Sequence, residues 1–83
     1  MFTVYALFSE KYMKIYIGMT SSLEKRLYAH NHIPKGWAYR YRPWKIVHTE
    51  LFSSKQEALK RERQLKSAKG REFIWGIIKL DCD

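Results

Sequence analysis

The sequence predicts an α+β fold in which a small three-stranded antiparallel sheet is flanked by three to four helices. Segments rich in β-branched and aromatic residues, typical of strands, occur near the N-terminus and in the middle of the chain. Helix-capping pairs of the Ser-x-x-Glu type precede segments whose apolar residues recur at helical spacing. The resulting order of strand, strand, helix, strand, helix, helix indicates a small sheet covered by helices.

The expected strands are residues 2–8, 14–18 and 44–52. In the first of them, Phe2, Val4, Ala6 and Phe8 share one face, and Thr3, Tyr5 and Leu7 share the other. Because most of these side chains are apolar, we expect the strand to be covered on both sides. The short polar connector before the second strand predicts that the first two strands pair as a hairpin.

The first expected helix follows Ser21, which forms a capping-box pattern with Glu24. It should end before Pro34, since the residue ahead of a proline disfavours helical geometry. Residues 34–43 (PKGWAYRYRP) are then expected to form a basic, aromatic loop.

A second capping box, Ser54 with Glu57, predicts a helix over about residues 55–68. Gly70 fits the position just past its end. Residues 71–80 are predicted to form a short final helix that packs on the sheet.

The 83 residues have a formal net charge of +8 and fit a single domain over 1–83. Such an excess attracts polyanions, and the basic residues interleaved with aromatics from Trp37 to Trp44 favour nucleic acid. An anionic membrane surface is the second choice, because no long amphipathic helix has a basic face. No signal peptide or membrane span is apparent, and the lone Cys82 implies no intramolecular disulfide, so we expect a cytoplasmic protein.

Three features could carry chemistry, and the first two are pairs of residues. Tyr5 and Tyr16 lie on the two strands of the expected hairpin, where their phenols could converge, although both could be ordinary strand aromatics. Arg26 and His30 are one helical turn apart, which pairs a permanent cation with a group that titrates near neutrality. The alternative for this second pair is the solvated face of a basic helix.

Glu62 follows Ala58 by four residues and precedes Leu65 by three, so its carboxylate should project from the apolar stripe of its helix. A carboxylate there is costly unless it meets a metal ion or a cation. The sequence alone leaves open a metal site and a salt bridge to a Lys or Arg.

These features together resemble the signature of the GIY-YIG nucleases. The likeness rests on VYA at 4–6, YIG at 16–18, Arg26, His30 and the later helical Glu62. The tract IYIGMTSSLEKRLYAHN matches the family pattern, and EALKRERQLKSAKGREFI is most similar to small stand-alone members. Two departures are Val4-Tyr5-Ala6 in place of Gly-Ile-Tyr and the absence of an asparagine after Glu62.

The resemblance implies an endonuclease that hydrolyses DNA phosphodiester bonds in repair or recombination. It implies that Glu62 holds one Mg²⁺ or Mn²⁺ ion and that Arg26 stabilises the phosphate charge. Tyr5 or Tyr16 would accept the proton of the attacking water and pass a proton to His30. A tyrosine base needs nearby positive charge to lower its pKa, and Gly18 should allow a close approach of the backbone to a helix or to substrate.

Affinity for DNA is expected to come from phosphate contacts and from base stacking, which would favour branched or single-stranded forms. An inactive nucleic-acid-binding module of the same fold and a protein-interaction module that recruits a nuclease remain alternatives. A protein partner could then supply targeting. The basic face of the helix after Ser54 is also expected to contact phosphates. The individual residues expected to contact nucleic acid are Lys35, Trp37, Tyr39, Arg40, Arg42 and Lys45.

Overall fold

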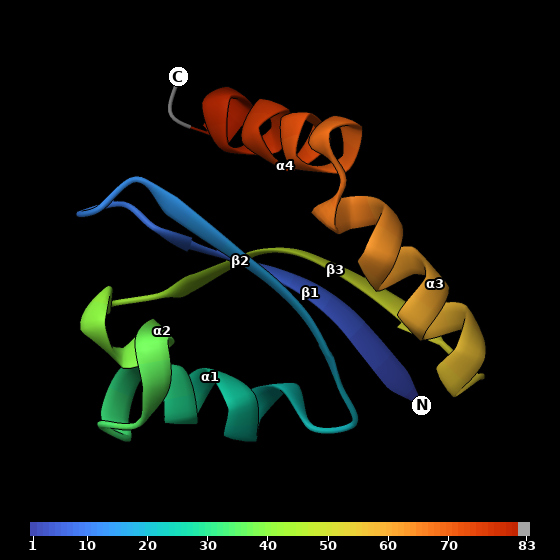
Figure 1. Cartoon of the computed structure of the whole chain (residues 1–83), viewed down its shortest axis with the longest axis horizontal. Helices are drawn as coiled ribbons and strands as arrows, with labels where there is room; N and C mark the ends of the chain where they lie inside the picture. The colour runs from blue at the N-terminus through green and yellow to red at the C-terminus, as the bar shows by residue number, and fades with distance from the viewer. Residues whose placement is uncertain (82–83) are drawn as a thin grey trace.

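The computed structural model describes residues 1–81, so Cys82 and Asp83 lie outside the described part of the chain. A central strand, β1, is flanked by two further strands, and four helices pack around this sheet (Figure 1). The predicted α+β class with a three-stranded antiparallel sheet is therefore confirmed. The elements in chain order are β1 (Phe2–Ser9), β2 (Lys14–Thr20), α1 (Leu23–His32), α2 (Gly36–Arg40), β3 (Lys45–Phe52), α3 (Lys55–Lys66) and α4 (Ala68–Asp81).

The sheet has the order β2-β1-β3, and both pairings are antiparallel. β1 occupies the centre because both of its faces are apolar, and every residue from Val4 to Ser9 is buried. In the hairpin, Tyr5 lies opposite Gly18 and Leu7 lies opposite Tyr16. This register brings the two tyrosines onto the same face of the sheet as diagonal neighbours.

Two helices lie on each side of the sheet (Figure 1). Helices α3 and α4 pack on one face, where Leu65 of α3 joins sheet residues such as Val4 and Ile17 in the larger apolar cluster. Helices α1 and α2 cover the other face, where Tyr5, Leu7 and Trp44 form a smaller cluster. Among residues 1–81, no helix has the length and apolar character that a membrane crossing requires.

The start of α1 differs from the predicted capping box. Its N-cap is Ser22, not Ser21, and no side chain caps the helix. The amide of Ser22 instead donates to Oγ1 of Thr20 at 3.0 Å, which fixes the turn that leads from β2 into the helix. The helix ends at His32, before Pro34, as predicted.

The segment that was predicted to be a loop contains the short helix α2. Tertiary hydrogen bonds hold it: Nε1 of Trp44 donates to the carbonyl oxygen of Ala38 at 2.6 Å. The side chain of Asn31 bonds both the amide and the carbonyl of Trp44, at 2.7 Å and 3.1 Å. These contacts link α1 and α2 to Trp44, the residue before β3, and local sequence patterns do not reveal them.

The capping box of α3 is confirmed, because Oγ of Ser54 accepts a hydrogen bond from the amide of Glu57 at 3.4 Å. The position predicted for Gly70 is wrong: α3 ends at Lys66, and Gly70 lies within the first turn of α4. A Cβ at Gly70 would collide with the backbone of Leu65, so the glycine is needed where the two helices meet closely.

Candidate active site

The aromatic rings of Tyr5 and Tyr16 stack on the face of the sheet that α1 and α2 cover. Their centroids lie 6.2 Å apart and their planes differ by 20°. Tyr5 is buried, with 1% of its surface exposed, whereas Tyr16 is partly exposed. The hairpin thus brings the two phenols together, and only Tyr16 also faces open space.

Gly18 makes this arrangement of the tyrosines possible. A Cβ on Gly18 would lie 2.6 Å from Oη of Tyr5 and 3.2 Å from the ring of Tyr16. The close approach predicted for Gly18 is therefore present, but the group that approaches is the Tyr5 side chain, not a helix or substrate. Any larger residue would displace the phenol from the strand beside it.

The hydroxyl of Tyr5 is buried and has no hydrogen-bond partner among the described protein groups. Burial raises the pKa of Tyr5 from 10.0 to about 12, and the neighbouring Tyr16 adds to the rise. The positive charge of Arg26 lowers the pKa of Tyr5, as expected, but burial outweighs this effect. The prediction of a lowered pKa is therefore wrong for Tyr5, which remains a neutral phenol at physiological pH.

His30 lies on α1 with its ring centroid 4.5 Å from that of Tyr16. It is buried, and its Nε2 atom has no hydrogen-bond partner within the described residues. Burial lowers the pKa of His30 from 6.5, and the positive charge of Arg26 lowers it further. His30 is consequently a neutral imidazole at pH 7, with a ring nitrogen able to accept a proton.

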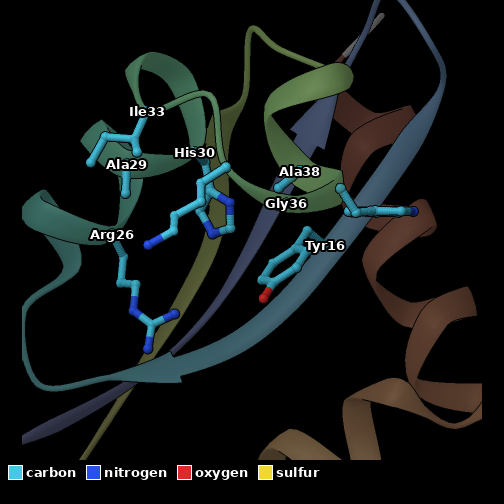
Figure 2. Close-up of a pocket in the computed structure, with 9 residues that line it drawn as sticks. Tyr16, Arg26, Ala29, His30, Ile33, Gly36 and Ala38 are labelled. Atoms are coloured by element: carbon cyan, nitrogen blue, oxygen red, sulfur yellow. The ribbon is translucent and has the colours of Figure 1, made fainter.

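Arg26, His30 and Tyr16 face a common space between α1, α2 and β2 (Figure 2). The space is a cavity of about 370 Å³ that opens to solvent. Arg26 is exposed there and forms no ion pair with the side chains that the structure describes. A guanidinium free to bind an anion thus lies one helical turn from a neutral imidazole. The lining residues are Tyr16, Arg26, Ala29, His30, Ile33, Lys35, Gly36, Trp37 and Ala38.

Glu62 projects from α3, which packs on the other face of the sheet and also contacts β2. Its side chain is only 20% exposed, and Oε2 lies 3.4 Å from Nζ of Lys66. The charge of Glu62 is the smallest of the causes that raise the pKa of Tyr5, after burial and the charge of Tyr16. The salt bridge that the sequence left open is thus present, and Glu62 does not line the cavity that holds Arg26 and His30.

Glu62 is the residue that would hold a divalent cation, and its carboxylate already pairs with Lys66. Within residues 1–81, no group of three or more His, Cys, Asp or Glu side chains could hold a metal ion. A cation held by Glu62 would therefore take most of its other ligands from water and phosphate oxygens. Mg²⁺ is commonly bound in this way, through one or two carboxylates together with substrate phosphate.

A second cavity, of about 420 Å³, lies on the other side of Tyr16 and Trp37. These two aromatic residues line both cavities, so they form a shared wall. The charged residues of the second cavity are Lys66 and Arg71. Lys66 belongs to the helix after Ser54, whose basic face was expected to contact phosphates, whereas Arg71 was not predicted to contact nucleic acid. Lys66 follows Glu62 by four residues, and this spacing is the sequence signal that the two side chains lie together on α3.

The residues expected to contact nucleic acid separate into two groups. Lys35 and Trp37 line the cavity that holds Arg26, and Trp37 is 52% exposed, so it is not a core residue. Arg42 instead covers the ring of Tyr39 at 3.9 Å and donates to its carbonyl at 3.1 Å.

The other two basic residues of the expected set also lie apart from this cavity. Arg40 lies 5.9 Å from the ring of Tyr41. Lys45 lines a different cavity together with Phe8, Glu10, Lys11, Pro43 and Trp44. Neither residue is brought beside Arg26 and His30.

Comparison with known proteins gives the same family as these residues do. The GIY-YIG catalytic domain matches residues 1–75. The chain belongs to the GIY-YIG family. Membership implies nuclease chemistry on DNA and, as in GIY-YIG nucleases generally, a divalent metal ion.

Similar GIY-YIG proteins are found in several bacteria. A UPF0213 protein of Syntrophus aciditrophicus is 42% identical over 62 residues, which cover 72% of this chain and 71% of that protein. UPF0213 proteins of Staphylococcus haemolyticus and Staphylococcus saprophyticus are 42% and 39% identical; each match covers 64% of this chain. The chain spans about two thirds, 66%, of each staphylococcal protein. No solved structure matches it significantly.

Proposed function

We propose that this GIY-YIG chain is a single-domain, divalent-metal-dependent DNA endonuclease of low sequence specificity that acts in cytoplasmic DNA repair or recombination. The observation that carries the proposal is the convergence of Arg26, His30 and Tyr16 on one cavity. Glu62 on α3, whose charge contributes to the raised pKa of Tyr5, would supply the acidic group. The four side chains supply the groups needed to bind a phosphate and to activate water.

Arg26 would bind the nonbridging oxygens of the scissile phosphate, because its planar guanidinium can donate two hydrogen bonds at once. It is exposed and faces the cavity, so a phosphate can reach it without a rearrangement of the fold. The negative charge that accumulates as phosphorus becomes five-coordinate would be stabilised by this fixed cation.

Tyr16 is the phenol suited to contact the attacking water, since it lines the cavity whereas the Tyr5 hydroxyl is buried. As the water loses its proton to Oη of Tyr16, the phenol would pass its own proton to the neutral imidazole of His30. The water oxygen then bonds to phosphorus and the bond to the 3′ oxygen breaks; the 3′ oxygen takes a proton from solvent, which leaves a 5′-phosphate and a 3′-hydroxyl. Tyr5 would hold the Tyr16 ring in position through their stacking contact.

Glu62 would hold the divalent cation, which when bound supplies charge stabilisation at the phosphate and leaving oxygens. Its partial burial favours such a role, because a carboxylate with little solvent around it gains from a second positive charge. Lys66 already neutralises part of this charge, and that feature favours the alternative of an inactive DNA-binding module of the same fold.

A plasmid-nicking assay with Mg²⁺, with Mn²⁺ and with a chelator tests the proposal. We expect nicking that requires a divalent ion, and removal of one transition-state donor in Arg26→Ala should reduce its rate by about 100-fold or more. Glu62→Ala should lose activity at every ion concentration. Metal-independent nicking, or full activity in either variant, would contradict the proposal, and DNA binding without any nicking would favour the inactive module.

A further inference from the structure

The second cavity has the character of a binding site for a negatively charged group. Its walls are the side chains of Ile15, Tyr16, Ile17 and Trp37, and both of its charged residues are cations, Lys66 and Arg71. Arg71 is exposed and forms no ion pair with the side chains described in residues 1–81. A guanidinium above apolar and aromatic walls interacts more strongly with an anion than one surrounded by water alone.

The position of this cavity relates it to the proposed catalytic groups. Tyr16 and Trp37 line both cavities, so Arg26 lies on one side of the aromatic wall and Arg71 on the other. Trp37 rests against Trp44 with centroids 6.0 Å apart and against Tyr16 at 5.9 Å, which fixes its ring, yet it is half-exposed. A rigid, exposed indole between two cationic sites offers a stacking surface flanked by two anion sites.

We propose that Lys66 and Arg71 bind a second phosphate of the same DNA strand, and that the base between the two phosphates stacks on Trp37. The proposal rests on the proposed function, because it takes the scissile phosphate to lie beside Arg26. In a duplex the flat faces of the bases are covered by their neighbours, so Trp37 can receive a base only from an unpaired stretch. The preferred substrate class is therefore DNA with a single-stranded segment, such as a flap or a gap.

DNA binding in the presence of a chelator tests this subsite without cleavage. The probes are labelled oligonucleotides of equal length, one single-stranded and one duplex, and the readout is fluorescence anisotropy over a range of salt concentrations. The variants are Arg71→Gln, Lys66→Gln and Trp37→Leu. The matched control is Lys69→Gln, which removes the same charge from α4 two residues before Arg71 but lines a different cavity.

We expect Arg71→Gln and Lys66→Gln each to weaken single-strand binding by about tenfold and to reduce the salt slope by about 0.7. Trp37→Leu should weaken single-strand binding by about tenfold or more and leave duplex binding nearly unchanged. The control should match the unaltered chain in slope. Losses in Arg71→Gln no larger than those of Lys69→Gln, or equal losses of Trp37→Leu on both probes, would overturn the proposal.

The nicking assay separates this inference from the proposed function. Metal-dependent nicking together with unchanged binding by Arg71→Gln and Lys66→Gln would refute the second phosphate site and leave the endonuclease proposal standing. Weakened single-strand binding in those variants without any nicking by the unaltered chain would support the phosphate site and refute the endonuclease. Thermal unfolding followed by circular dichroism establishes that each variant is folded.

Discussion

The hydroxyl of Tyr5 lies against the backbone of Gly18 on the neighbouring strand, at a place where a Cβ would come within 2.6 Å of the oxygen. The absence of a side chain at Gly18 thus determines where the phenol lies, and the phenol in turn supports the ring of Tyr16. One glycine in β2 therefore affects both the packing of the sheet and the geometry of the proposed catalytic groups.

Gly18→Ala is expected to lower the free energy of unfolding by about 1–3 kcal/mol, because an added methyl group in a packed site forces neighbours to move. Urea denaturation measures this change, and nicking activity should fall with it as Tyr16 loses its support. Gly76→Ala is the matched control: Gly76 lies in α4, and a Cβ there meets nothing within 4 Å. That variant should gain about 0.5–1 kcal/mol, since alanine favours a helix over glycine. Equal stability changes in the two variants would contradict the argument.

Tyr5→Phe is expected to stabilise the fold while it alters the proposed site. The buried hydroxyl has no partner among the described protein groups, and removal of an unsatisfied group of this kind gains about 1 kcal/mol. The raised pKa means that the folded state keeps the phenol neutral, so its contribution to stability is present below pH 10 and is lost as the pH rises toward 12. Urea midpoints at pH 7 and pH 11 test this, and Tyr5→Phe should lose less stability between them than the unaltered chain.

The pH dependence of stability below neutrality should come from His30. Because its pKa is lowered in the folded state, the unfolded chain binds the proton first, and stability present above pH 6.5 declines as the pH falls below it. His30→Gln should flatten the decline between pH 7 and pH 5. His32→Gln serves as the control, since His32 is an exposed residue of the same helix. The pKa of Glu50 is lowered from 4.5 in the folded state, so Glu50 takes up its proton at a pH below the interval from 7 to 5.

The fold was predictable where a pattern is local. Alternating apolar residues locate β1 and β2, and the cap at Ser54 locates the start of α3. Helix α2 was not predictable in this way, because it is held by Trp44, six residues from Ala38, and Trp44 is held in turn by Asn31, thirteen residues away. The error at Gly70 has a similar origin, since the glycine is required by the contact between two helices.

The sequence predicted the residues of the proposed site, but it did not predict the second cavity beside them. Helical spacing and strand alternation are sufficient to bring Arg26 near His30 and Tyr5 near Tyr16. The second cavity combines β2, α2 and the junction of α3 with α4, so no single periodicity marks Arg71 as part of it. Nor could composition predict that burial would outweigh Arg26 in setting the pKa of Tyr5, because burial depends on the assembled fold.

Lys66→Gln should change two affinities in opposite directions. Nζ of Lys66 lies 3.4 Å from Glu62, so removal of its charge leaves the carboxylate more available to a cation. We expect affinity for Mn²⁺, measured by titration calorimetry without DNA, to rise about threefold, a modest gain because Lys66 is half-exposed. DNA affinity in a chelator should fall in the same variant, because the proposed phosphate contact is lost.

Lys60→Gln is the control for this last prediction, because Lys60 is exposed on α3 and lies two residues from Glu62, on a different side of the helix. It should leave both affinities close to those of the unaltered chain. A damaged fold would lower both affinities together, whereas a charge effect at Glu62 raises one and lowers the other. If Mn²⁺ affinity instead fell in Lys66→Gln, the lysine would be holding the carboxylate in a metal-binding geometry, and competition between the two cations for Glu62 would be excluded.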